Sequence, residues 1–446
     1  MLKKESVIIL LILMTAVVLS AVNSDIFTIV SQDSRGIEIQ FNLPKYEIVD
    51  TEINHEIFQK ISMNHEIYTA KEGLPELPIF STMIEIPNNG TVSAEFVQEN
   101  TQTETGVNIV KYYNKPEEAS PIANQNAFYP LNNLKISAPS IWRDVRVVSI
   151  VVTPFRTNTS TGELEAVETG TIRVSYDINT QGENELTLSR GKSATFNSIY
   201  KANILNYVEE NLRTDDPPCI LYVYNNALNY TTYLKPLVDW KHQQGFEVHT
   251  ASTAVTGSST TSITSYLQTA YETWSNPPDF FVLAGDTSGS YALPYYTISY
   301  YSAPGDHPYA LVSGNDELED VFMGRISFET EAELAIIVNK ILLYEKNQLF
   351  PAASWMNANL LVGDTNPSGI SCISANKYMK EIMDDYRDDF TYTELYGADP
   401  SATTVSTTLN NGVGYFHYRG WIGMSNFSNT NINALTNTGK IPICII

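Results

Sequence analysis

The spacing of apolar residues changes near position 218, and this change constrains the fold more than any other feature. Between residues 24 and 203, Thr, Val, Ile and Tyr alternate with polar residues in short segments such as 147–153 and 170–176. Such alternation is typical of strands that bury one face, and a Thr-Gly turn at 161–162 predicts a hairpin. We therefore predict an all-β domain, in the form of a sandwich, over residues 24–206.

Beyond residue 218 the pattern is that of strands alternating with helices. The run 219–224 is almost continuously apolar, as a strand buried on both faces requires. Strands are also predicted at 246–250, 279–284, 321–326, 359–362 and 412–418, and helices at 231–244, 262–274, 331–345 and 375–386. This alternation implies right-handed crossovers and a mostly parallel sheet. We predict a proline-ended linker at 207–218, followed by two α/β sub-domains at 219–350 and 351–446.

A Gly-Asp pair follows a predicted strand in each of these sub-domains. The pairs are Gly285-Asp286 and Gly363-Asp364. Open α/β sheets build their sites at the carboxyl ends of their strands. The two pairs therefore suggest two related sub-domains, although Gly-Asp is also a common turn, and the pattern alone does not separate the two interpretations.

The N-terminus carries an export signal. Lys3 and Lys4 precede an apolar run at 7–22, which small and polar residues follow. This order is typical of a secretory signal, predicted at 1–23; the run is slightly short for a membrane anchor, which is the alternative. No later stretch predicts a transmembrane span, so the mature chain is expected to be secreted or on the cell surface by bacterial-type export. The sequence does not indicate an oligomeric state.

Charge and the scarcity of ligand residues exclude several functions. The net charge of −23 argues against nucleic acid and anionic membranes as partners. Three cysteines, Cys219, Cys372 and Cys444, are too few for a disulfide framework. The six histidines form no H-E-x-x-H motif, and the chain has no C-x-x-C motif and no EF-hand loop.

Several phrases resemble one family of peptidases. One stretch reads Asp306-His-Pro-Tyr-Ala-Leu-Val-Ser-Gly-Asn-Asp-Glu-Leu-Glu-Asp-Val-Phe-Met-Gly-Arg-Ile-Ser. It is similar to the gingipain family of caspase-like cysteine peptidases, as is the helix that follows it. The phrase Gly73-Leu-Pro-Glu-Leu-Pro is similar to the β-rich propeptide of that family. The resemblance implies a zymogen of a cysteine-type endopeptidase, with a propeptide-like all-β domain before a caspase-like α/β domain. It implies protein or peptide substrates, and a thiolate that attacks the peptide bond without a cofactor.

The position of the family's catalytic histidine holds a different residue here. The phrase 416–423 resembles the end of the strand that carries this histidine, but Trp421 occupies its place. Tryptophan cannot act as a base. His417 is the nearest histidine, yet its Cα lies roughly 13 Å back along an extended strand. His417 is therefore the candidate base, and a histidine packed in or beside the sheet is the alternative.

None of the three cysteines matches the family's nucleophile. The phrase 440–446 resembles the strand that leads to it, and the resemblance puts the nucleophile beyond Ile446. We expect Cys444 to be an inert thiol buried in that strand, Cys219 to open a core strand, and Cys372 to lie in a loop. The expectation is thus a fragment with an incomplete second sub-domain and no activity of its own. An exported non-catalytic pseudopeptidase or surface binding protein is the alternative; an adhesive or carbohydrate-active β-sandwich would explain only residues 24–203.

Acidic residues are concentrated in the family-like stretch. Asp316, Glu317 and Asp320, with Glu319 between them, are candidates for orienting the histidine or for binding a structural calcium ion. The alternative is a solvated acidic turn.

Overall fold

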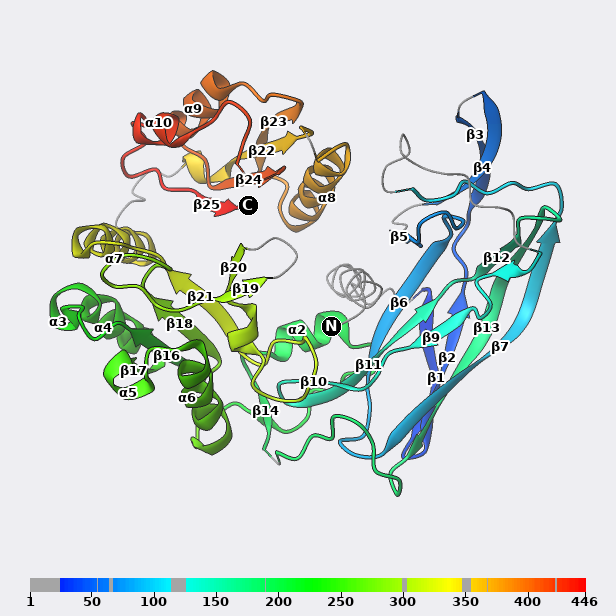
Figure 1. Ribbon diagram of the computed structural model, residues 1–446, viewed down its shortest axis with the longest axis horizontal. Coiled ribbons are helices and arrows are strands. Elements are labelled where there is room, and N and C mark those ends of the chain that lie inside the picture. The colour runs from blue at the N-terminus through cyan, green and yellow to red at the C-terminus, as the bar shows by residue number, and fades with distance from the viewer. Residues whose placement is uncertain are drawn as a thin grey trace. The chain divides into compact units, whose positions relative to one another are not determined.

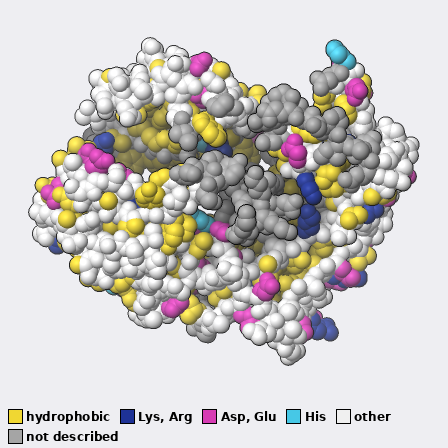
Figure 2. Space-filling view, in the orientation of Figure 1, with side chains coloured by type: hydrophobic (Ala, Val, Ile, Leu, Met, Phe, Trp, Pro, Cys, Tyr) yellow, Lys and Arg dark blue, Asp and Glu magenta, His cyan; other side chains and the backbone are white. Residues whose placement is uncertain are grey.

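The computed structural model describes residues 25–446, except 54, 64–66, 114–125, 189, 299–302, 347–353, 367 and 422. The predicted signal at 1–23 lies outside the described residues. Among the residues that are described, no helix is long and apolar enough to cross a membrane. Acidic side chains are spread over the visible surface rather than gathered into one patch (Figure 2).

Contacts divide the chain into two compact units. The first holds the described residues up to Ala227 together with Lys241–Glu329, and the second holds Leu228–Trp240 together with Thr330–Ile446. The predicted boundary between sub-domains at 350 differs from this division, because the helix α7 (Glu331–Glu345) belongs to the second unit.

The N-terminal part of the first unit is built of antiparallel strands (Figure 1). One sheet has the order β1 (Phe27–Asp33), β2 (Gly36–Asn42), β13 (Glu163–Asp177), β12 (Phe155–Asn158), β8 (Phe128–Tyr129), and β7 (Thr91–Glu104) also pairs with β13. A second has the order β10 (Ser140–Trp142), β11 (Val145–Val152), β6 (Pro78–Glu85), β5 (Ile67–Tyr68), with β9 (Leu134–Ile136) on β11. A separate hairpin joins β3 (Glu47–Ile53) and β4 (Glu56–Ser62).

Alternating apolar residues of these two sheets pack against one another in a shared core cluster. Ile37, Ile39 and Phe41 of β2 are fully buried and pack in a cluster with residues of β6 and β11. The alternation thus buries one face of each strand, as the period of two predicts. The mostly-β character of this region is confirmed, and so is the hairpin between β12 and β13.

A short helix that was not predicted from the sequence lies between this region and the α/β region. It is α2 (Asn197–Asn203), flanked by β14 (Lys192–Ser193) and β15 (Leu212–Arg213), which pair in parallel. Its residue Tyr200, with Phe196 just before the helix, shares a core cluster with Met83 and Trp142, and Phe196 stacks on Phe322 at 4.3 Å. The β-rich and α/β parts of the first unit therefore share a continuous core.

The α/β part of the first unit contains a four-stranded parallel sheet. The strand order is β17 (Glu247–Ser252), β16 (Cys219–Tyr224), β18 (Phe280–Ala284), β21 (Phe322–Ile326). The remaining elements are α5 (Thr253–Thr256), α6 (Thr260–Thr273), β19 (Tyr296–Ile298), β20 (Ala303–Gly305) and η2 (His307–Ala310). The helix predicted at 231–244 lies mostly in the second unit. It is divided into α3 (Tyr230–Tyr233) and α4 (Lys235–Gln243), because Pro236 cannot continue the preceding turn.

The second unit repeats this sheet topology. Its parallel strands have the order β23 (Thr391–Gly397), β22 (Ala358–Asp364), β24 (Tyr415–Arg419), β25 (Ile443–Ile445). The helices include α8 (Ser371–Tyr386), α9 (Ala402–Asn411), α10 (Asn429–Asn433) and η3 (Ser354–Asn357). Numbered along the chain, both sheets have the order 2-1-3-4. The Gly-Asp pairs are nevertheless not equivalent, since Gly285-Asp286 follows the third strand and Gly363-Asp364 ends the first.

Candidate active site

His417 lies in the middle of β24 and points to the α8 face of the second sheet. Its neighbours Phe416 and Tyr418 point to the other face, where they join a core cluster with Val405 and Leu409 of α9. Alternate residues of a strand face opposite sides, so this packing forces His417 toward α8. The side chain is 7% exposed. The prediction that His417 lies within the strand, rather than at its tip, is correct.

Asn376 of α8 fixes the orientation of the His417 ring. The Asn376 amide nitrogen donates to the carbonyl oxygens of Cys372 at 2.8 Å and Val362 at 3.1 Å. Its Oδ1 therefore accepts from His417 Nδ1 at 2.8 Å, which puts the proton on Nδ1 and leaves Nε2 as the basic atom. Burial and the neighbouring charge of Arg419 lower the pKa of His417, so the ring is neutral at pH 7.

Trp421 lies in the loop that follows β24 and is 52% exposed. The Tyr418 hydroxyl donates to the carbonyl oxygens of Gly423 at 2.7 Å and Trp421 at 3.2 Å, which holds this loop over the end of the strand. Gly420 is required there, because a Cβ atom at this residue would lie 2.2 Å from the Tyr418 hydroxyl. The loop is thus ordered by its own contacts, with an indole in the position that the resemblance assigns to the base.

Asp364 ties the same loop to the end of β22. Its carboxylate accepts from the backbone N–H of Ser425 at 2.8 Å and of Asn366 at 3.0 Å. Burial opposes ionisation of Asp364, but these hydrogen bonds outweigh it and lower the pKa. Asp364 is therefore an ionised structural anchor at the carboxyl edge of the second sheet, where α/β sheets build their sites.

Cys444 faces away from His417 within the same sheet. In the parallel pair β24–β25, Cys444 is opposite Phe416 and Ile445 is opposite His417. Paired residues of neighbouring parallel strands share a face, so the thiol and the imidazole are on opposite faces. Cys444 is also exposed, which corrects the expectation of a buried thiol, since β25 is an edge strand. Desolvation still raises the pKa of this thiol.

The other two cysteines are buried. Cys372 is the second residue of α8 and 2% exposed, so the expectation that it lies in a loop is wrong. The helix α8 begins at Ser371, four residues before the predicted start at residue 375. Cys219 opens the core strand β16, as expected, and is fully buried. Desolvation first, and then the nearby carboxylates of Glu247 and Asp279, raise the pKa of Cys219 to about 12.

The acidic candidates lie in the first unit, and two of them bind backbone groups of the β-rich region. Asp320 accepts from the N–H groups of Arg143, Val312 and Ser313 at 2.7–2.9 Å, while burial raises its pKa to about 8. Asp316 accepts from the N–H of Ile141 at 2.8 Å. Glu317 is near His307, with 4.0 Å between Glu317 Oε2 and His307 Nδ1. Asp316 and Asp320 therefore join two regions of the chain; calcium at these residues stays a prediction.

A buried arginine beside these carboxylates was not predicted from the sequence. Arg143, in the turn between β10 and β11, is fully buried and donates to the carbonyl oxygens of Asp320 at 2.6 Å and Pro278 at 2.8 Å. It also forms ion pairs with Asp279 at 2.9 Å and Asp144 at 3.3 Å. Arg-Asp between two strands is typical of a solvated hairpin turn, so local sequence offered no signal for burial.

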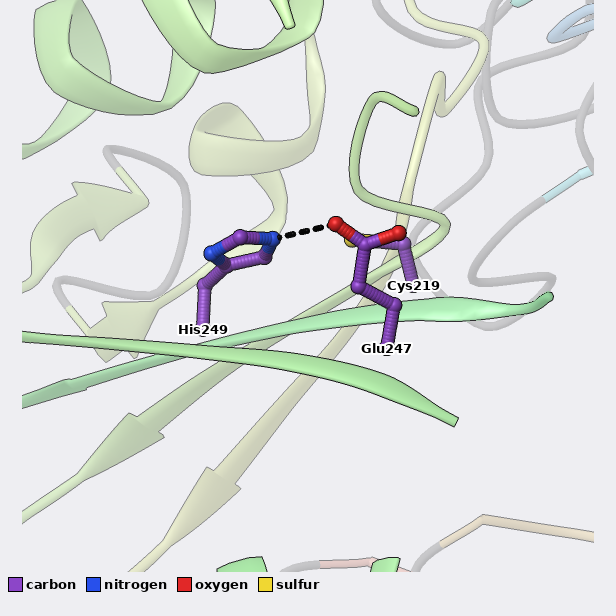
Figure 3. Close-up of side chains that lie close together, drawn as sticks. All are labelled: Cys219, Glu247 and His249. Carbon is purple, nitrogen blue, oxygen red and sulfur yellow. Dashed lines mark hydrogen bonds and ion pairs between the residues drawn. The ribbon is translucent and has the colours of Figure 1, made fainter. Parts of the chain in front are cut away.

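Cys219 is also part of a second group that no sequence motif indicates. Its Sγ, a Glu247 oxygen and a His249 ring nitrogen all lie within 4.8 Å of one another (Figure 3). Among the described residues, these three side chains are the ones of type His, Cys, Asp or Glu that lie close enough together, as a group of at least three, to bind a metal ion. Residue 219 is distant in sequence from residues 247 and 249, and the spacing of 247 and 249 matches no metal-binding motif. Only the pairing of β16 with β17 therefore brings the three side chains together.

Comparisons with known proteins identify two adjoining family regions. The model of peptidase family C25 matches residues 213–446, and the C25 propeptide model matches residues 20–215. Gingipain R2 of Porphyromonas gingivalis is 24% identical over 451 residues, covering 93% of this chain and 58% of that protein. Lys-gingipain of the same organism is 24% identical, covering 94% of this chain and 26% of that protein. The chain thus spans about half, or less, of the length of these relatives.

Two solved structures were also found to be similar. The crystal structure of the Arg-specific cysteine proteinase gingipain R has a TM-score of 0.45 and 22% identity, covering 52% of this chain and 54% of that one. A complex of the pro- and mature domains of Porphyromonas gingivalis RgpB has a TM-score of 0.37 and 20% identity, covering 42% of this chain and all of that one. The two family matches adjoin along the chain, and the peptidase model covers more than half of it. The chain belongs to peptidase family C25 and carries a C25 propeptide region before the peptidase region.

Proposed function

We propose that this chain belongs to the secreted precursor of a cysteine endopeptidase, in which the β-rich propeptide region stabilises the adjoining part of the peptidase region. The observation that carries the proposal is the match of a C25 propeptide model and a C25 peptidase model to adjoining parts of one chain. The export signal predicted at 1–23 supports secretion or display at the cell surface. The substrates would be proteins or peptides, cut by thiolate attack on the peptide carbonyl.

The buried contacts of Arg143 support this stabilising role. The propeptide region inserts a guanidinium that two carboxylates, Asp144 and Asp279, neutralise inside the first unit. Arg190 donates to Asp144 at 3.0 Å, which completes the charge balance. Separating the propeptide from the peptidase region would leave Asp279 buried without its cation, a costly state. The propeptide is thus expected to remain bound until the first unit rearranges.

The catalytic pair itself would require a thiol that these 446 residues do not supply in a suitable place. Cys444 is on the wrong face of the sheet for His417, Cys219 is a core thiol whose pKa is about 12, and Cys372 is buried in α8. A nucleophilic cysteine needs a thiolate with access to the substrate. We therefore propose that the 446-residue chain does not cleave peptide bonds by itself.

The coding sequence beyond codon 446 tests the proposal. We expect an in-frame segment that continues the β25 strand and presents a cysteine at its end. A longer chain that includes this segment should become covalently labelled by a peptidyl chloromethyl ketone, and substitution of that cysteine by serine should abolish labelling. A gene that ends at codon 446, or continues without such a cysteine, would contradict the endopeptidase proposal.

The second candidate function is an exported pseudopeptidase that binds proteins without cutting them. Trp421 favours it, because an exposed indole occupies the position where the family resemblance expects the base. Exposed aromatic side chains are frequent at binding surfaces. The same labelling experiment separates the two candidate functions. A longer chain whose cysteine is intact but never labelled would favour the pseudopeptidase. Labelling of that cysteine would exclude the pseudopeptidase.

A further inference from the structure

Three side chains of different chemistry meet at the amino-terminal edge of the first parallel sheet. Cys219 is the first residue of β16 and is paired with Glu247, the first residue of β17, while His249 is two residues further along β17. Paired residues of parallel strands share a face, and so do residues i and i+2 of one strand. The convergence therefore follows from strand register, which is more rigid than a loop.

The carboxylate and the imidazole are already held in place. Glu247 Oε1 lies 2.7 Å from His249 Nε2 (Figure 3). The amide nitrogen of Asn276 donates to Glu247 Oε2 at 2.8 Å. The Asn276 nitrogen also donates to the carbonyl oxygen of Pro217 at 2.9 Å, which fixes the amide. The Trp274 ring packs against the imidazole, with 4.4 Å between the ring centroids.

Solvent reaches two side chains of this group and not the third. The Cys219 residue is fully buried, whereas the His249 and Glu247 side chains are 39% and 38% exposed. An ion would therefore approach past the imidazole and the carboxylate and meet the sulfur last. A metal site needs such a path as well as its ligands.

We propose that Cys219, Glu247 and His249 form a zinc site that clips the start of β16 to the start of β17. Thiolate, imidazole and carboxylate are all zinc ligands, and water would complete a tetrahedron. A tetrahedral ion with ordinary zinc bond lengths separates its ligand atoms by roughly 3.2–3.7 Å. The present group, within 4.8 Å, needs only side-chain adjustments to reach that geometry. Sulfur and nitrogen ligands disfavour calcium and magnesium, which prefer oxygen.

The reaction on binding balances with the loss of one proton. The Cys219 thiol releases its proton to solvent and binds as thiolate. His249 in its neutral form offers the Nε2 lone pair, with its own proton on Nδ1, and Glu247 replaces its hydrogen bond to the ring by a bond to the ion. Nothing is oxidised or reduced.

The location indicates a structural role. The amino-terminal ends of parallel strands lie at the edge opposite to the carboxyl ends, where α/β sheets hold their catalytic residues. The Cys219 N–H donates to Asp279 at 3.0 Å, and Asp279 is the partner of the propeptide residue Arg143. Zinc would thus brace the start of β16, whose backbone is hydrogen-bonded to the buried charge cluster, and it should raise the melting temperature of the whole chain.

Titration of the metal-free full chain with Co²⁺ and then Zn²⁺ tests the site. We expect one equivalent of Co²⁺ to give a sulfur-to-cobalt charge-transfer band and the visible bands of a tetrahedral ion, and one equivalent of Zn²⁺ to displace it. Cys219→Ser should abolish the charge-transfer band. His249→Gln, at a half-exposed side chain that is easier to replace without unfolding, should weaken zinc binding at least tenfold.

Cys444→Ser is the matched control, because it removes an exposed thiol and leaves the three ligands intact. It should retain the full cobalt spectrum and the zinc-dependent rise in melting temperature. Far-ultraviolet circular dichroism reports whether each variant is folded. The proposal is overturned if the unaltered chain gives no charge-transfer band, or if the band survives in folded Cys219→Ser, or if His249→Gln binds zinc as tightly as the unaltered chain.

Discussion

The two parallel sheets share a strand order but satisfy their buried polar groups in opposite ways. The first sheet contains a carboxylate, Asp279, whose cation Arg143 comes from the propeptide region. The second sheet contains a neutral imidazole, His417, whose partner Asn376 comes from the adjacent helix of the same unit. The ion pair between Arg143 and Asp279 should make the first sheet depend on the propeptide region, whereas His417 in the second sheet finds its partner within its own unit. The sharpest tests change one partner on each side of this comparison.

The largest effect is expected from Arg143→Met, which keeps the length of the side chain and removes its charge. Asp144 and Asp279 would lose their shared cation inside the protein, so the first unit should lose about 3–5 kcal/mol of stability. Hydrogen exchange of β16 and β18 amides in the full chain measures this loss. Arg35→Met, at an exposed ion pair with Asp33, is the control and should leave exchange unchanged. Equal exchange in both variants would refute the dependence on the propeptide.

A smaller effect, confined to the second unit, is expected from Asn376→Ala. The carbonyl oxygens of Val362 and Cys372 and the Nδ1–H of His417 would lose their partner, at a cost of about 2–3 kcal/mol. Faster exchange should appear in β22 and β24 and not in β16. Asn433→Ala on the exposed side of α10 provides the comparison, with no change expected. Unchanged protection of the β24 amides against hydrogen exchange would mean that Asn376 does not fix the orientation of the His417 ring.

Acidification should weaken the second unit through the same histidine. Burial lowers the pKa of His417 below its ordinary value of 6.5, so the folded state binds fewer protons than the unfolded state as the pH falls. The stabilising contribution is complete above pH 6.5 and is lost as the pH falls below it. The measurement is the protection of β24 amides against hydrogen exchange at pH 7.5 and pH 5.5, two buffers that bracket the ordinary pKa of histidine. The difference between the two pH values should be smaller in His417→Gln than in the unaltered chain. A variant with an unchanged pH dependence would show that other groups cause it.

The smallest effect is expected from Trp421→His. The indole is 52% exposed, so its replacement should leave the melting temperature nearly unchanged. Restoring the residue that the family resemblance expects should not produce peptide hydrolysis, because a base without a paired thiol lacks a nucleophile. Fluorogenic peptide substrates provide the assay. Hydrolysis by this variant that Cys444→Ser abolishes would show that the two strands pair differently in solution.

The sequence predicted helices and strands well where a regular spacing of apolar residues extended over several residues. The strand β16 and the helix α7 match their predicted bounds, since one is uniformly apolar and the other begins with a Thr330–Glu333 capping box. The helix α9 was missed because its Thr- and Asn-rich sequence has low helix propensity; Val405 and Leu409 hold it by packing on the sheet.

The candidate site was predictable only in part. Motif order identified the peptidase family, and simple strand geometry correctly kept His417 away from the strand tip. The exposure of Cys444 depended on β25 being an edge strand, which requires the strand order. The pairs Arg143–Asp279, Asn376–His417 and Cys219–Glu247 each join residues that are at least 28 positions apart in the chain. No local pattern encodes such contacts.

We propose that, among the described residues of this C25 propeptide and peptidase chain, no cysteine forms a working thiol–imidazole pair with His417. Incubation of the purified full chain with a peptidyl chloromethyl ketone, followed by intact mass and peptide mapping, tests it most directly. We predict no adduct beyond the slow, His417-independent alkylation of exposed Cys444 that iodoacetamide also gives. Rapid labelling of any of Cys219, Cys372 or Cys444 that disappears in folded His417→Gln would contradict the claim.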